Sequence, residues 1–149
     1  GRVKTNLGTD DYGFDLAISG GKVVVAGKSD GNIAIVQYTA SGALDPTFSG
    51  DGRLVTNLGL LSPWLTRVVI QAGKIVAVGG TGDDGLLVRF TAAGDLDTTF
   101  SADGIVTTDW IGGNDFYSSV VFKNGRYYVV GTSISASDID RFIVAAYTP

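Results

Sequence analysis

Short runs of apolar residues, each bounded by glycine or polar turn residues, recur along the chain at a fixed interval. The run at 21–27 returns at 73–79 and again at 125–131, with 52 residues separating successive copies. Self-similarity at a fixed period is typical of repeat architectures. The pattern therefore predicts a single repeat domain, 1–149, with the units 1–51, 52–103 and 104–149.

Each unit is predicted to form four β-strands. The first has roughly alternating apolar and polar residues, and the second leads into a two-residue hairpin turn, namely Gly20-Gly21, Ala72-Gly73 or Asn124-Gly125. The third and fourth are almost continuously apolar. The predicted strands are 1–6, 14–19, 21–27 and 33–39 in the first unit, 52–57, 66–71, 73–79 and 86–91 in the second, and 104–109, 118–123, 125–131 and 142–148 in the third. No helix of useful length is expected.

The continuous apolar character of the third and fourth strands indicates burial on both faces of each sheet. The sheets are therefore expected to stack on one another, and each fully buried Val, Leu or Ile contributes about 1.5–3 kcal/mol relative to exposure. A linker, 40–48 or 92–100, follows the fourth strand. Phe48 and Phe100 are expected to fill the joint between sheets. Asp45 and Asp97 are expected to accept backbone hydrogen bonds in tight turns.

The repeat also resembles a known family. Its elements are Gly-Lys before an apolar run that ends in Gly, an apolar strand that ends in an aromatic residue, and Gly-x-Leu-Asp-x-Thr-Phe at 42–48 and 94–100, each followed by Asp-Gly. Over essentially its whole length the chain resembles the delta-60 repeat, also described as a domain of unknown function of β-propeller type. The resemblance implies four-stranded blades around a central axis, and an occurrence mainly in large secreted or surface-attached bacterial proteins.

These observations predict an all-β fold, a β-propeller segment of three four-stranded blades. Three blades cannot close a ring, since propellers have about four to eight. The ring is therefore expected to be completed by another copy or by the rest of a longer chain, and the exposed apolar blade faces favour self-association into an oligomer. The alternative is a β-trefoil, which also has three repeats of four strands and closes as a monomer.

Composition narrows the partners and the chemistry. The chain has 11 basic and 15 acidic residues, a net charge of −4 and no basic cluster, so nucleic acid is not an expected partner. No apolar run reaches the roughly 18 residues of a membrane span. Cysteine, histidine and glutamate are absent, so disulfides and thiolate sites are excluded and catalysis would depend on aspartates. Methionine is absent even at residue 1, so we expect a processed chain or part of a longer one.

Aromatic residues are the first candidates for a binding site. Tyr12, Trp64 and Phe116 occupy the same repeat position, in the loop expected after the first strand, and could stack on sugars. The favoured interpretation is that each ring packs between adjacent blades. Trp110 lies outside the repeat pattern and is a weaker candidate, expected to be exposed.

Aspartate pairs at 10–11, 83–84 and 138/140 could bind calcium through oxygen ligands, but none has the alternating spacing of a known calcium loop, so turn roles are favoured and no metal or cofactor is expected. The loop at 133–140 is five residues longer than its counterparts and could carry a protein-specific function. We expect a non-catalytic structural or protein-interaction module of a secreted or cell-surface assembly. The alternatives are a carbohydrate-binding propeller that uses the loop aromatics and, more remotely, an aspartate-based hydrolase.

Overall fold

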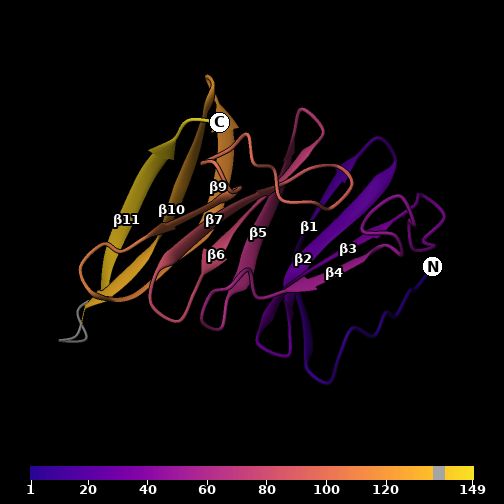
Figure 1. Cartoon of the computed structure of the whole chain (residues 1–149), viewed down its shortest axis with the longest axis horizontal. Coiled ribbons are helices and arrows are strands. Elements are labelled where there is room, and N and C mark those ends of the chain that lie inside the picture. Colours follow the sequence, from indigo (N-terminus) through magenta and orange to yellow (C-terminus); the bar gives the residue numbers. More distant parts are fainter. Residues whose placement is uncertain (136–139) are drawn as a thin grey trace.

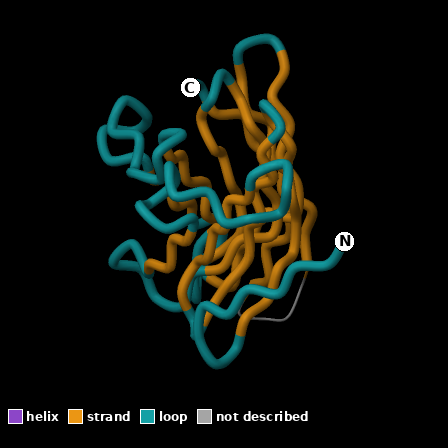
Figure 2. Tube along the Cα trace, turned by 90° about the vertical axis from the view of Figure 1, so that its right-hand side faces the viewer, coloured by secondary structure: helices purple, strands orange, loops and turns teal. Residues whose placement is uncertain are grey.

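The chain consists of antiparallel β-strands in a computed structural model that describes residues 1–135 and 140–149 (Figures 1 and 2). The strands are β1 (Asp11–Ser19), β2 (Lys22–Ser29), β3 (Asn32–Tyr38), β4 (Arg53–Thr56), β5 (Trp64–Gln71), β6 (Lys74–Gly80), β7 (Gly85–Phe90), β8 (Ile105–Thr108), β9 (Gly113–Lys123), β10 (Arg126–Ser135) and β11 (Asp140–Tyr147). The described residues contain no helix, and thus none that could cross a membrane. The predicted all-β class is confirmed. Residues 136–139 of the longer loop predicted at 133–140 lie outside the described residues, while residues 133–135 belong to β10 and Asp140 begins β11.

The strands form two sheets. One has the order β1-β2-β3-β4, and the other has the order β11-β10-β9-β6-β7-β8 with β5 paired to β6. In the larger sheet, β5–β8 and β9–β11 are joined through one residue pair, Gly80 with Phe116. We call β1–β4, β5–β8 and β9–β11 the first, second and third subsheets; Figure 1 shows them in this order from right to left. The prediction of three four-stranded blades is therefore not confirmed, since the sheets hold four and seven strands.

The outer strand of a subsheet comes from the next repeat unit. β4 belongs to the second unit but pairs with β3, where Val55 lies opposite Ala34, and β8 of the third unit pairs with β7 in the same way. The predicted first strand of each unit thus completes the subsheet before it. Residues 1–6 lie in no strand and pair with no strand of the described residues, which corrects the prediction for that segment. Without a neighbouring strand their alternating pattern has no ladder to join.

The three predicted hairpin turns are confirmed. They connect β1 to β2, β5 to β6 and β9 to β10, and both turn residues have positive φ in each, for example 50° at Asn124 and 73° at Gly125. These angles match the type I′ turns that suit the twist of paired strands. The glycine that ends each apolar run has a different role, because a Cβ there would lie within 2.0 Å of a carbonyl oxygen on the preceding strand. Those glycines and carbonyls are Gly27 with Tyr12, Gly79 with Trp64, and Gly131 with Phe116.

The core consists of two layers, each between neighbouring subsheets. Val24 and Ile35 of the first subsheet pack with Ile75 and Ala77 of the second, while the opposite face of the second packs against the third. The first strands also contact one another in order, β1 with β5 and β5 with β9. Phe48 and Phe100 are buried in the first and second layers respectively, so the prediction that they fill the joints is confirmed. These stacked, open sheets differ from the closed barrel of the β-trefoil alternative.

Candidate functional site

The aromatic residues at the shared repeat position lie in strands and not in a loop, which corrects the sequence interpretation. Tyr12 belongs to β1, Trp64 begins β5 and Phe116 belongs to β9. The first strand of each subsheet is longer than predicted because it keeps pairing past an irregularity in register, such as the one between Gly13 and Asp15. A bulge interrupts the periodicity on which the strand boundary was predicted.

Trp64 and Phe116 meet where the second and third subsheets join. Their ring centroids lie 6.4 Å apart with the planes tilted by 48°, and both residues are half-buried. Gly80 makes this approach possible, because a Cβ there would lie 2.8 Å from Cζ2 of Trp64 and 2.9 Å from Cβ of Phe116. The geometry of this pair is that of rings packed between adjacent sheets.

Tyr12 has a different environment. Its side chain is 51% exposed, and its ring stacks on Phe14 with centroids 6.2 Å apart and an interplanar angle of 6°. Lys28 places its ammonium nitrogen 5.0 Å from the centre of the Tyr12 ring. Tyr12 and Phe14 therefore form one exposed aromatic platform with a cation over its Tyr12 ring, separate from the Trp64–Phe116 pair.

Trp110 is half-buried, in contrast to the expectation that it is exposed. Its backbone N–H donates to Oδ2 of Asp115 at 2.7 Å, and its indole Nε1 donates to the hydroxyl of Tyr117 at 3.3 Å. Tyr117 is fully buried and shares a 2.6 Å hydrogen bond with Tyr147. Trp110 thus packs against the third subsheet through contacts that the sequence pattern did not reveal.

The aspartates of the sequence pairs lie in bends or at strand starts: Asp10, Asp83 and Asp84 lie in bends, whereas Asp11 begins β1 and Asp140 begins β11. Asp83, Asp84 and Asp109 line a shallow cavity of about 290 Å³, where burial and then the charges of Asp109 and Asp83 raise the pKa of Asp84. Within residues 1–135 and 140–149, no group of three or more acidic side chains is placed to hold a metal ion. Asp11 accepts hydrogen bonds from the N–H groups of Leu7 at 2.8 Å and Gly8 at 3.4 Å, and the Leu7 bond is the main cause of its lowered pKa. Asp138 lies outside the described residues.

Asp45 and Asp97 anchor the linkers, as predicted, and also form ion pairs, of which the Asp97–Arg89 pair is buried. Oδ1 of Asp45 accepts from the N–H of Thr47 at 3.0 Å, while its Oδ2 lies 2.7 Å from the Lys22 ammonium group. The Lys22 contact is the largest cause that holds the pKa of Asp45 well below its ordinary value. Oδ2 of Asp97 lies 2.8 Å from Nε of Arg89 and 3.1 Å from the Lys74 ammonium group.

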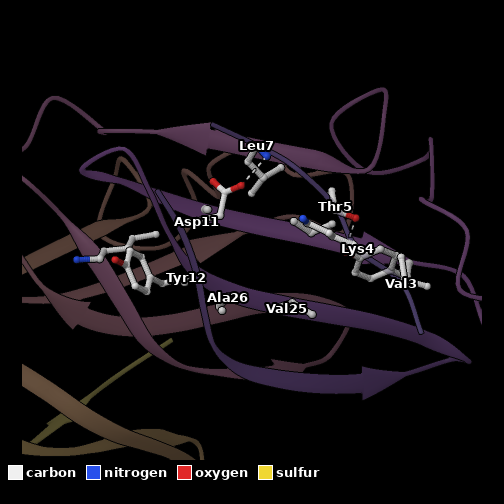
Figure 3. A pocket seen from close by; sticks show the side chains of 14 residues that line it. Val3, Lys4, Thr5, Leu7, Asp11, Tyr12, Val25 and Ala26 are labelled. Carbon is white, nitrogen blue, oxygen red and sulfur yellow. Dashed lines mark hydrogen bonds between the residues drawn. The ribbon is translucent and has the colours of Figure 1, made fainter. Parts of the chain in front are cut away.

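The N-terminal segment forms a cavity against the first subsheet. Val3, Lys4, Thr5 and Leu7 line one side of it and residues of β2 and β3 line the other, around a volume of about 290 Å³ (Figure 3). The hydroxyl of Tyr38, the last residue of β3, donates to the Thr5 hydroxyl at 2.7 Å. The segment is therefore tied across the face of the first subsheet that points away from the second.

Two apolar surfaces lie at opposite ends of the stack, and the sequence interpretation did not identify their residues. The first end face, on the first subsheet, consists of Leu16, Ile18, Val23 and Val25; the last end face, on the third subsheet, consists of Val121, Tyr128, Val130, Phe142 and Val144. Ile18 is 68% exposed and Phe142 is 95% exposed. Successive side chains of a strand point to opposite faces of the sheet. Aligning the first and third repeat units with the second, and assigning alternate strand positions to alternate faces, would locate both apolar surfaces from the sequence.

Comparison with known proteins supports the repeat assignment. A family model described as "Domain of unknown function (DUF5122) beta-propeller" matches residues 20–48 and 73–100. Each matched segment begins at a hairpin turn and ends at a buried linker phenylalanine, Phe48 or Phe100. The chain is thus similar to a β-propeller domain of unknown function, as its repeat pattern indicated. No curated protein and no solved structure matches the chain.

Proposed function

We propose that this chain is a non-catalytic β-propeller segment of three blades that acts as a structural and protein-interaction module in a secreted or cell-surface assembly. Its two end faces dock on further blades of the same kind, and a second copy of the chain can supply them. In this proposal the three subsheets are the blades, and the third has three strands, β9–β11, in the described residues.

One observation carries this proposal: each end face has a buried counterpart in the second subsheet. Leu16 and Val25 of the first end face stand at the repeat positions of Val68 and Ala77, which are buried against the first subsheet. Residues of the last end face occupy the same repeat positions as Val76, Val78 and Leu87 of the second subsheet. In the second subsheet these residues are buried against the third subsheet. The last end face of one copy is therefore shaped to receive the first end face of another.

Light scattering on two charge variants tests the proposal. The unmodified chain is expected to associate as its concentration rises, while Leu16→Asp and Phe142→Asp, each with one damaged end face, are expected to associate at least tenfold more weakly. Burial of an unpaired carboxylate between apolar faces has this effect. Leu61→Asp is the matched control, because Leu61 is 69% exposed and lies on neither end face.

Mixing the two variants distinguishes the geometry. Leu16→Asp leaves the last end face intact, and Phe142→Asp leaves the first end face intact. If the contact is head to tail, an equimolar mixture is therefore expected to form dimers that neither variant forms alone. A monomeric unmodified chain at all concentrations, or equal weakening by Leu61→Asp, would contradict the proposal.

A second candidate function is carbohydrate binding, and the Tyr12–Phe14 platform favours it. Two parallel aromatic rings with an adjacent Lys28 could stack on a sugar face. In this alternative, glycan-array binding is lost in Tyr12→Ala and retained in Phe116→Ala, whose ring is half-buried at a joint. Binding that survives Tyr12→Ala removes the platform from consideration.

A further inference from the structure

Residues 1–6 have the sequence pattern of an outer strand but no strand to pair with. Gly1-Arg2-Val3-Lys4-Thr5 occupies the same repeat positions as 52–56, which includes β4, and 104–108, which includes β8. β4 pairs with β3 and β8 pairs with β7, but residues 1–6 lie in no strand. Residues 1–6 therefore have the sequence of an outer strand but pair with no strand of the described residues.

A pair of equivalent hydrogen bonds shows that the segment already has the position of an outer strand. Thr108 ends β8 and lies 2.7 Å, hydroxyl to hydroxyl, from Tyr147 at the end of β11 in the next subsheet. Thr5 stands at the same repeat position as Thr108, and its hydroxyl lies 2.7 Å from that of Tyr38 at the end of β3. Residues 1–5 therefore relate to the first subsheet as β8 relates to the third.

The third subsheet shows the complementary gap. β11 corresponds to β3 and β7, each of which has an outer partner, whereas β11 pairs only with β10 within the described residues. Its exposed edge presents unpaired backbone groups, which is the usual template for addition of a strand. The two gaps lie at opposite ends of the molecule, so one chain cannot fill its own gap (Figure 1).

We propose that residues 2–5 of one copy pair antiparallel with β11 of a second copy and complete its third blade. This inference rests on the proposed end-to-end docking and adds a strand exchange to it. The register follows from Val36 opposite Arg53 and Ile33 opposite Thr56 in the first subsheet. Carried to the equivalent positions, it places Arg2 opposite Ala145 and Thr5 opposite Phe142 of the second copy.

The same comparison identifies which backbone groups join the new ladder. Gln37 donates its N–H to the carbonyl of Gly52 at 2.9 Å, and Arg89 donates to Gly104 at 2.8 Å. Hydrogen-bonded pairs alternate along an antiparallel ladder. Val3 is therefore a hydrogen-bonded position of the exchanged strand, and the N–H of Lys4 faces outward.

Cysteine cross-linking tests the register, since the chain contains no cysteine of its own. Under mild oxidation, a mixture of Arg2→Cys chains and Ala145→Cys chains is expected to give disulfide-linked dimers. The matched control pairs Arg2→Cys with Ala146→Cys, whose side chain lies on the opposite face one residue away. At least tenfold less cross-linked dimer is expected in the control.

Two proline variants test the ladder by light scattering. Val3→Pro removes a ladder donor and is expected to weaken association about tenfold, whereas Lys4→Pro replaces an outward N–H and is expected to change it less than threefold. Equal cross-linking in both mixtures, or equal effects of the two prolines, overturns the strand exchange while leaving end-face docking intact. An unmodified chain that stays monomeric overturns both.

Discussion

Equivalent strand positions are buried in the second subsheet and exposed in the third. Val76, Val78 and Leu87 are each 0% exposed. Their counterparts Tyr128, Val130 and Val144 are 37%, 38% and 66% exposed. An apolar run thus indicates that a sheet can stack on another sheet. Whether its residues are buried depends on whether a neighbouring subsheet covers them. Substitutions at matched positions of the two subsheets measure this difference directly.

The largest expected effect is that of Val78→Asp. The side chain lies between the second and third subsheets, where a carboxylate would have neither water nor a cation to balance its charge. We expect the free energy of unfolding to fall by about 4 kcal/mol or more, enough to prevent folding of a domain of ordinary stability. Urea unfolding followed by circular dichroism measures it.

Val130→Asp is the matched variant at the exposed position. At concentrations low enough to keep the chain monomeric, the free energy of unfolding is expected to change by no more than about 0.5 kcal/mol. A loss as large as that of Val78→Asp would mean that the last end face is covered within a single chain, which contradicts the comparison.

A smaller effect is expected from the buried ion pair of the second subsheet. Arg89 is 6% exposed and bonds to Asp97, whereas the first subsheet has the neutral Gln37 at the same position, 3.0 Å from Asp45. Asp97→Asn leaves the Arg89 charge without its partner and is expected to cost about 3 kcal/mol at neutral pH. Asp95→Asn, at an exposed position of the same linker, is the control.

The pH dependence of that variant sharpens the test. The Thr99 hydroxyl, with Lys74 and Arg89, lowers the pKa of Asp97 from 3.8 to about 2 in the folded chain. A lowered pKa contributes stability above the unfolded value, and this contribution is lost as the pH falls toward the folded value. Between about pH 4 and pH 2 the decline in stability is therefore expected to be shallower in Asp97→Asn, and an unchanged slope would show that Asp97 is not the titrating group.

The sequence predicts the features that residues within one repeat unit determine, and it does not predict the features that depend on pairing between units. Strands, hairpin turns and buried Phe48 and Phe100 follow from glycine, asparagine and apolar runs within one unit. Assignment of β4 and β8 to the preceding subsheet depends on contacts between units, which a single copy does not reveal. The sequence pattern predicts loops at Tyr12 and its counterparts because a bulge shifts the strand boundary. The anchored position of Trp110 depends on its hydrogen bond to Tyr117, which periodicity cannot locate.

The smallest effect compares the same turn in two subsheets. Ala72 and Asn124 both occupy the first position of a hairpin turn, with φ of 49° and 50°. A left-handed backbone costs alanine more than asparagine, whose side chain bonds locally. Ala72→Asn is therefore expected to raise the free energy of unfolding by about 0.5–1 kcal/mol, and Asn124→Ala to lower it by a similar amount. Both residues are exposed, so packing does not enter, and urea midpoints that move in the same direction would show that backbone strain is not what distinguishes the two turns.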